Sequence, residues 1–125
     1  MDTRTKILTA ADARRIAGPV TLATGCFDVL REESLQELEA LAASPLLVAV
    51  LPLEGALLGQ RARAELVAGL RMVDYVIAAS QDEVEELIRA LKPERVARLE
   101  AAHERVAQGL RELVHRRQGD AAKAC

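Results

Sequence analysis

The stretch Leu22-Ala23-Thr24-Gly25-Cys26-Phe27-Asp28-Val29-Leu30-Arg31-Glu32-Glu33-Ser34-Leu35 decides the fold of this chain. A short apolar run ends at Gly25, a tight loop carries Phe27 and Asp28, and an amphipathic pattern begins at Glu32. This order predicts a strand, a turn and a helix, the unit from which parallel α/β sheets are built. In such sheets, ligands bind where a loop leaves the carboxyl end of a strand and the next helix presents its unpaired N–H groups. We therefore expect any ligand site to lie at this turn.

Composition sets the class of protein. The 125 residues suit one domain with its own core, and with 50% hydrophobic and 29% charged residues a disordered chain is excluded. No apolar run approaches the roughly 20 residues of a membrane span, and the first residues lack a secretory pattern. We expect a cytoplasmic protein that does not bind membranes. A formal net charge of −2 and only one Phe and one Tyr argue against nucleic-acid binding.

The strand and helix signals alternate on both sides of the central stretch. We expect strands over residues 20–24, 46–51 and 73–78, with helices over 10–17, 32–42, 62–70 and 81–91. Ser80 and Glu83 match a capping box at the start of the last of these helices. Residues 1–8 are expected to be a loosely held lead-in. The alternation predicts a small Rossmann-like α/β fold with a doubly wound parallel sheet.

The C-terminal third has a different pattern. Apolar residues at helical spacing predict a long added helix from about Leu99 to Arg116. Within residues 94–98, the segment Arg95–Ala97 fits either a helix or a fourth, edge strand, and the sequence leaves both open. We expect one α/β domain over residues 1–117 and a disordered tail over 118–125.

With the Gly25–Asp28 turn in place, the chain resembles the cytidylyltransferase-like nucleotidyltransferases, especially the adenylyltransferase domain of ADP-heptose synthesis and glycerol-3-phosphate cytidylyltransferase. The matching segments are collinear: Thr24–Leu30, Leu47–Val50, Arg63–Leu70, Val73–Val76 and Glu85–Pro93. The resemblance implies a nucleotidyltransferase fold, a dimer, and transfer of CMP or AMP to a sugar or polyol phosphate. Any such activity would use a nucleoside triphosphate with Mg²⁺. It also implies nucleotide contacts from Gly25, Cys26, Phe27, Asp28 and Arg31.

The phosphate-binding motifs of that family are missing. The family turn runs into His-x-Gly-His, whose imidazoles bind phosphates and stabilise the departing pyrophosphate. Here those places hold Arg31, Glu32, Glu33 and Ser34, so that an anion replaces the glycine. The lysine expected after the second family strand is replaced by the apolar segment Leu51–Leu58, and the late Ser/Thr-rich motif is absent. Arg31 and Ser34 remain as candidate catalytic residues, although neither restores an imidazole pair.

These losses predict a non-catalytic member that acts by protein interaction or weak nucleotide binding. The alternative is an active nucleotidyltransferase with a rearranged site, in which Arg31 and Ser34 replace the histidines and Asp28 positions the nucleotide. A third hypothesis is a small helical regulator whose resemblance is accidental and whose last helix binds nucleic acid through its basic end.

Each candidate residue also has a structural interpretation. Asp28 contacts a nucleotide or caps backbone N–H groups in its loop. Cys26 is a reactive thiol or a small buried residue, and Phe27 is expected in the core. Arg61, Arg63 and Arg71 are expected to be ordinary solvated helix arginines. His103 and His115 are expected on the surface, because no other ligand lies at metal-binding spacing from them, and Cys125 is expected to be a free thiol. We therefore predict no metal site.

Two apolar surfaces call for a partner. Leu53, Ala56, Leu57 and Leu58 lie in a predicted loop, where apolar side chains must fold back on the core or face another chain. The seam of the predicted C-terminal helix presents the same choice. We expect either packing within the subunit or an interface with a second copy or a protein partner.

Overall fold

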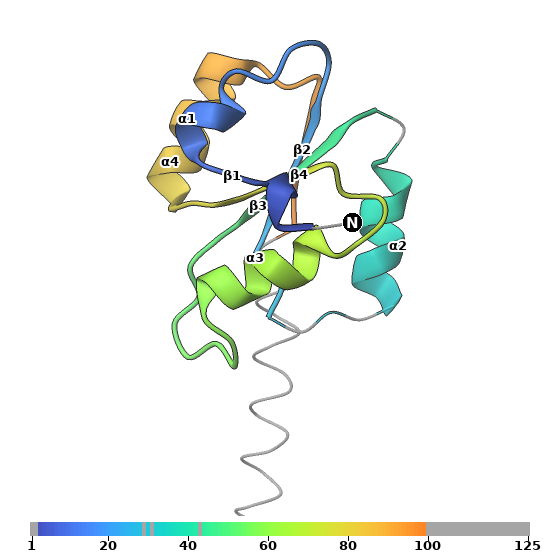
Figure 1. Ribbon diagram of the computed structural model, residues 1–125, viewed down its shortest axis with the longest axis vertical. Helices are drawn as coiled ribbons and strands as arrows, with labels where there is room; N and C mark the ends of the chain where they lie inside the picture. Colours follow the sequence, from blue (N-terminus) through green and yellow to red (C-terminus); the bar gives the residue numbers. More distant parts are fainter. Residues whose placement is uncertain (1–2, 29, 31, 43, 100–125) are drawn as a thin grey trace, which may run out of the picture.

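The computed structural model describes residues 3–28, 30, 32–42 and 44–99. In this part of the chain a five-stranded parallel sheet lies between helices (Figure 1). Its order is β1-β4-β3-β2-β5, and its strands are β1 (Ile7–Leu8), β2 (Thr21–Gly25), β3 (Leu46–Val50), β4 (Tyr75–Ala78) and β5 (Arg95–Arg98). The predicted α/β, Rossmann-like class is confirmed, and the sheet rules out an all-helical fold.

The two central strands are buried along their whole length. Every residue of β2 and β3 is buried, and the two strands pair in parallel with Ala23 opposite Val48. A continuous apolar run is what a strand covered on both faces requires. The start of β3 is fixed by Asp74, whose Oδ2 accepts a hydrogen bond from the Leu46 N–H at 2.8 Å.

The helices divide between the two faces of the sheet. Helices α2 (Glu32–Ala40) and α3 (Gln60–Ala68) pack on one face, where Leu38 and Val67 share a core cluster with Val48. Helices α1 (Ala10–Ala13) and α4 (Gln81–Leu91) pack on the other, where the core includes Ala13 and Leu87. This is the arrangement that right-handed crossovers produce when the chain reverses direction across a parallel sheet.

Local capping signals set two helix starts. Thr9 Oγ1 accepts from the Asp12 N–H at 3.1 Å at the start of α1. The predicted capping box at α4 is confirmed, because Ser80 and Glu83 exchange side-chain and backbone hydrogen bonds. Helix α1 is shorter than expected and ends at Ala13, followed by tighter turns that the sequence pattern did not distinguish from helix.

The prediction of a loosely held lead-in over residues 1–8 was wrong for residues 3–8, which the structure describes. Thr3–Lys6 forms a short 3₁₀ helix, and β1 follows it as an edge strand paired in parallel with β4. Ile7 and Leu8 pack against the two opposite core clusters, so this edge of the sheet is built from just two apolar residues. The proposed first strand of the sheet is consequently the second.

The ambiguity at residues 94–98 is decided in favour of a strand. Arg95–Arg98 pairs in parallel with β2, with Thr21 opposite Arg95 and Thr24 opposite Arg98. Residues 100–125 lie outside the described part, and with them the predicted C-terminal helix, the tail, His103, His115 and Cys125. Within the described part, none of the helices has the length and apolar character to cross a bilayer.

Candidate functional site

The topology places the candidate site at the carboxyl edge of the sheet, the edge at which all the parallel strands end. The chain leaves β2 towards β3 on one side, while β5 lies on the other side of β2. Such a switch point opens a crevice at the carboxyl ends of the strands. The carboxyl end of β2 is bordered here by the Cys26–Asp28 turn and by Leu99, whose N–H donates to Thr24 O at 2.8 Å.

The turn after β2 is anchored by a buried aromatic. Phe27 is 1% exposed, belongs to the core cluster on the α2–α3 face, and adopts a left-handed backbone with φ of 52°. That conformation is unfavourable for a bulky residue by about 1–2 kcal/mol, so the packing of the ring must offset it. Cys26 is also buried. Both side chains therefore form part of the core, in line with the structural interpretation of each.

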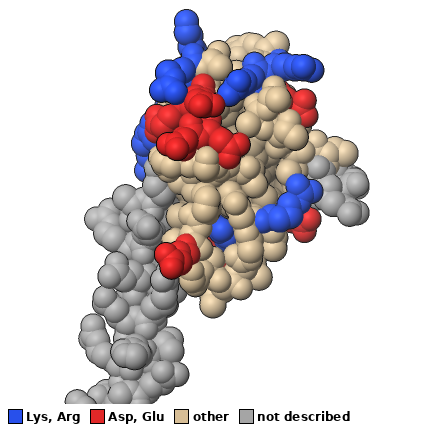
Figure 2. Space-filling view, turned by 90° about the vertical axis from the view of Figure 1, so that its left-hand side faces the viewer, with Lys and Arg blue, Asp and Glu red and all other residues tan. Residues whose placement is uncertain are grey.

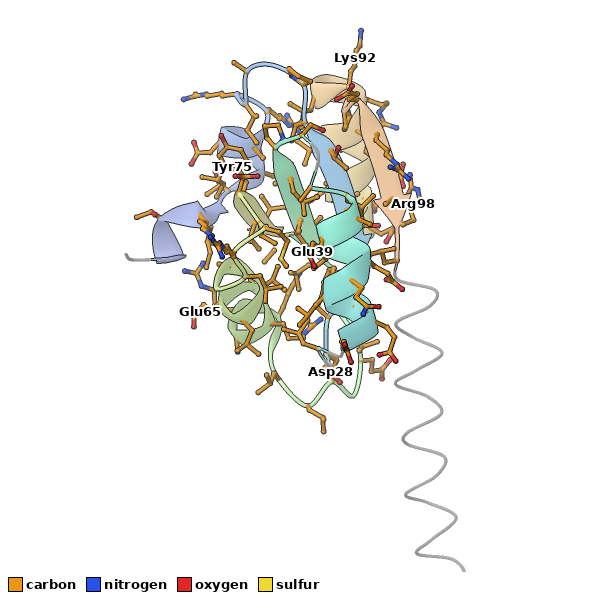
Figure 3. The ribbon with its side chains drawn as sticks, turned by 90° about the vertical axis from the view of Figure 1, so that its right-hand side faces the viewer. Asp28, Glu39, Glu65, Tyr75, Lys92 and Arg98 are labelled. Atoms are coloured by element: carbon orange, nitrogen blue, oxygen red, sulfur yellow. The ribbon has the colours of Figure 1, made fainter. Side chains whose placement is uncertain are left out.

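Asp28 binds backbone N–H groups of a distant loop. Its Oδ1 and Oδ2 accept from the Leu57 N–H at 2.9 and 3.2 Å, and Oδ1 also lies 3.4 Å from the Leu58 nitrogen. In Figure 3 the side chain lies at the end of the molecule where this loop turns. Hydrogen bonds to an ionised carboxylate are stronger than neutral ones. Asp28 thus holds the loop between β3 and α3 against the turn after β2.

Arg63 holds the same loop from within the protein. The side chain is 2% exposed, and Nη1 donates to Cys26 O and, at 2.8 Å, to Leu51 O. Nε donates to Leu58 O at 3.1 Å. Within the described residues, no carboxylate forms an ion pair with this guanidinium. The expectation that Arg63 is a solvated helix arginine was wrong, because three carbonyls of converging loops offset the cost of burying it.

We call Asp28, Arg63 and the backbone groups that they bind the loop clamp. Gln60 adds to it at the start of α3, since its Nε2 donates to Val50 O at 2.9 Å and to Ala79 O at 3.2 Å. The ends of β3 and β4 are joined in this way. The sequence did not single out Gln60. For Arg63 the available signal was its helical spacing from Ala64, Val67 and Ala68, residues that are all buried in α3.

The start of α2, where a phosphate would approach, is acidic. Glu32 and Glu33 occupy the first turn of α2 and are exposed, so their carboxylates lie near the N–H groups that a helix start would offer to an anion. Ser34 is buried, with 8% exposure. Arg31 lies outside the described residues. Arg61 and Arg71 are exposed, as predicted, and Arg61 pairs with Glu65 at 3.5 Å.

The loop of Leu53–Leu58 divides between core and solvent. Leu53 packs against the core cluster on the α1–α4 face, whereas Leu57 and Leu58 are 81% and 40% exposed. Figure 2 looks onto the face that carries α1 and α4, and shows charged side chains gathered over these helices and largely uncharged surface toward the carboxyl edge. On the face seen in Figure 2, this end of the molecule therefore offers apolar contact more than charge. Among the described residues, no three His, Cys, Asp or Glu side chains converge to hold a metal ion.

The fold is similar to that of a solved structure. It is the crystal structure of the lipopolysaccharide core biosynthesis protein from Thermoplasma volcanium GSS1, with a TM-score of 0.58 and 21% sequence identity. The two proteins share a fold. The match covers 62% of this chain and 71% of the other. No family model matches the sequence, and the comparison with curated proteins found no match.

The shared Rossmann-like fold brings together part of the predicted site. Gly25, Cys26, Phe27 and Asp28 form the turn at the carboxyl edge, and the Gly25 O accepts from the Leu51 N–H at 2.9 Å. Ser34 belongs to the following helix, with its side chain buried. The Asp28 carboxylate and the Gly25 carbonyl thus bind backbone N–H groups of the chain between β3 and α3.

Proposed function

We propose that this protein is a nucleotidyltransferase-like scaffold that no longer transfers nucleotidyl groups and acts by binding another protein at its carboxyl edge. The observation that carries the proposal is the burial of Arg63 beneath three backbone carbonyls. The cation that lies deepest at this edge is committed to the loop clamp. The likeness to the lipopolysaccharide core biosynthesis protein supports the scaffold part of the proposal.

The described residues at the carboxyl edge are poorly suited to stabilise the pyrophosphate that leaves in nucleotidyl transfer. Charge develops on the departing pyrophosphate, and preorganised cations or hydrogen-bond donors must stabilise it. Asp28 and Arg63 are engaged with backbone groups, and Glu32 and Glu33 add negative charge at the start of α2. Ser34 is too buried to present its hydroxyl freely. Among the residues that resemble the family motif, the cation left to bind a phosphate is Arg31.

Protein contact suits the same surface better. Leu57 and Leu58 are exposed on a loop whose backbone is fixed from two sides by the loop clamp. A fixed apolar surface loses little conformational freedom on association, which favours binding of an apolar partner surface. We therefore place the binding surface of the proposed function at Leu57 and Leu58.

The decisive test is turnover. Pyrophosphate release is measured with MgCTP or MgATP and a panel of sugar phosphates and polyol phosphates, for the wild-type chain, Arg31→Ala and the control Arg71→Ala. Arg71 is an exposed arginine that follows α3, away from the carboxyl edge. We expect no release above background in all three. Turnover that Arg31→Ala abolishes and Arg71→Ala preserves would establish the alternative, an active nucleotidyltransferase in which Arg31 and Ser34 replace the histidines.

Calorimetry separates the two non-catalytic modes. We expect no saturable heat when the wild-type chain is titrated with MgCTP or MgATP to millimolar concentration. Saturable binding without turnover, lost in Arg31→Glu and retained in Arg71→Glu, would replace protein contact by nucleotide binding as the function of this edge.

A further inference from the structure

The loop between β3 and α3 presents two adjacent leucines to solvent on a fixed backbone. Asp28 binds the N–H groups of Leu57 and Leu58, and Arg63 binds the carbonyl of Leu58. Leu53, in the same loop, packs against the core, whereas Leu57 and Leu58 are exposed. We call these two exposed residues the leucine pair. Adjacent apolar side chains on a backbone that is already ordered are suited to contact with another molecule.

Exposed acidic side chains lie near the leucine pair. Glu54 belongs to the same loop. Glu32 and Glu33 form the first turn of α2 and are exposed. Glu32 follows Asp28 by four residues, so that their Cα atoms are at most about 14 Å apart, and Figure 3 shows one end of α2 beside Asp28. We call Glu32, Glu33 and Glu54 the three edge glutamates.

Basic side chains do not balance the charge of the three edge glutamates. The buried guanidinium of Arg63 offsets the carboxylate of Asp28. Arg61, at the start of α3, is paired with Glu65 at 3.5 Å. In the sequence around the turn after β2, the base that remains is Arg31. The surroundings of the leucine pair are therefore negatively charged.

This charge selects the kind of partner. Charge complementarity around an apolar contact speeds association with oppositely charged partners and disfavours like-charged ones. Nucleic acids and anionic membranes are repelled by the three edge glutamates. A second copy would bring the same glutamates of both chains together, because a two-fold contact uses one patch on each chain.

We propose that the leucine pair docks a cationic amphipathic segment of another protein, which presents apolar side chains beside lysines or arginines. The apolar side chains cover Leu57 and Leu58, and the cations face the three edge glutamates. This inference rests on the proposed function and names the chemistry of the partner.

Peptide binding to the full chain tests the partner chemistry. The probes are two synthetic peptides patterned as the same amphipathic helix, one of leucine and lysine and the other of leucine and glutamate. Calorimetric titrations are made at low ionic strength, where surface charges are least screened. We expect the lysine peptide to bind the wild-type chain and the glutamate peptide to bind at least about tenfold more weakly.

One pair of variants tests the apolar contact. Leu57→Ser removes half of the leucine pair, whereas the control Leu66→Ser changes an exposed leucine of α3. We expect Leu57→Ser to weaken binding of the lysine peptide at least about fivefold and Leu66→Ser to change it by less than about twofold. Equal effects of the two substitutions would mean that the peptide does not bind at the leucine pair, and would overturn the proposal.

A second pair of variants tests the charges. Glu32→Gln/Glu33→Gln removes two of the three edge glutamates, and Glu37→Gln/Glu39→Gln removes two exposed glutamates further along α2. Both change the net charge equally. We expect the first to weaken binding of the lysine peptide at least about fivefold and the second by less than about twofold. Equal weakening would show attraction by net charge alone and overturn the proposal.

Three further outcomes would also overturn it. One is the absence of binding by the lysine peptide. Another is equal affinity for the two peptides, which would leave the proposed function standing with an uncharged apolar partner. The third is dimerisation of the wild-type chain in analytical ultracentrifugation that Leu57→Ser abolishes, which would assign the leucine pair to a second copy. Turnover in the pyrophosphate assay would overturn the proposed function independently of the peptide titrations.

Discussion

Arg63 and Asp28 bind opposite polar groups of one residue, Leu58. The Nε of Arg63 donates to the Leu58 carbonyl at 3.1 Å, while Oδ1 of Asp28 lies 3.4 Å from the Leu58 nitrogen and 2.9 Å from that of Leu57. Arg63 is buried and belongs to α3, whereas Asp28 is half-buried in the turn after β2. Together they fix the backbone of the loop between β3 and α3.

Removing the guanidinium should destabilise the protein strongly. Arg63→Met leaves three carbonyls without their donor, and we expect the free energy of unfolding to fall by about 2–4 kcal/mol in urea titrations. Arg61→Met, at an exposed position of the same helix, should change it by no more than about 0.5 kcal/mol. Equal stability of the two variants would contradict the structural role of Arg63.

Loss of the Asp28 carboxylate should loosen the loop more than the fold. We expect Asp28→Ala to raise hydrogen exchange at the Leu57 and Leu58 amides at least about tenfold, since about 1.4 kcal/mol of local stabilisation is lost. Glu54→Ala, in the same loop and exposed, is the control and should leave these rates unchanged. Unchanged exchange in Asp28→Ala would mean that other contacts hold the loop.

The capping box should make stability depend on acid pH. The Ser80 backbone N–H, and then the Ser80 hydroxyl, lower the pKa of Glu83 from its ordinary 4.5. A carboxyl with a lowered pKa in the folded state adds stability above its unfolded pKa and loses it as the pH falls through the folded value. The urea midpoint of the wild type should therefore fall more steeply below about pH 4.5 than that of Glu83→Gln. Parallel curves would exclude the contribution.

Glycine should improve the end of α4. Lys92 terminates this helix with a left-handed φ of 52° and is exposed at the end of the molecule away from Asp28 (Figure 3). Because glycine adopts that conformation without steric cost, Lys92→Gly is expected to stabilise the protein by about 0.5–1 kcal/mol. Arg89→Gly, one turn earlier and also exposed, should instead cost about 1 kcal/mol, and thermal unfolding would measure both. Destabilisation by Lys92→Gly would show that its side chain contributes more than its backbone costs.

The sequence patterns were sufficient for elements with strong local signals. Apolar runs bounded by Pro and Gly predicted β2 and β3, and Ser80 with Glu83 predicted the start of α4. Strand β1 escaped because Ile7 and Leu8 are too few to form a pattern, and their pairing partners lie in β4. Such pairing depends on contacts far along the chain, which local propensity does not contain.

The candidate site was predictable in position but not in its contacts. The Gly25–Asp28 turn lies where the strand-turn-helix pattern placed it. The burial of Arg63 was missed because arginine is rarely buried and because its acceptors are backbone carbonyls, which any sequence supplies. The three carbonyls come close enough to share one donor only when the loops converge in the folded structure.

The loop clamp also affects how the protein unfolds. Arg63 bridges groups that lie 37, 12 and 5 residues away along the chain, so its hydrogen bonds exist only when the turn after β2, the end of β3 and α3 are all in place. If one of these segments unfolded alone, the buried guanidinium of Arg63 would lose a hydrogen-bond acceptor. We expect these segments to form one cooperative unfolding unit, in which the amides with the slowest hydrogen exchange share a single opening free energy.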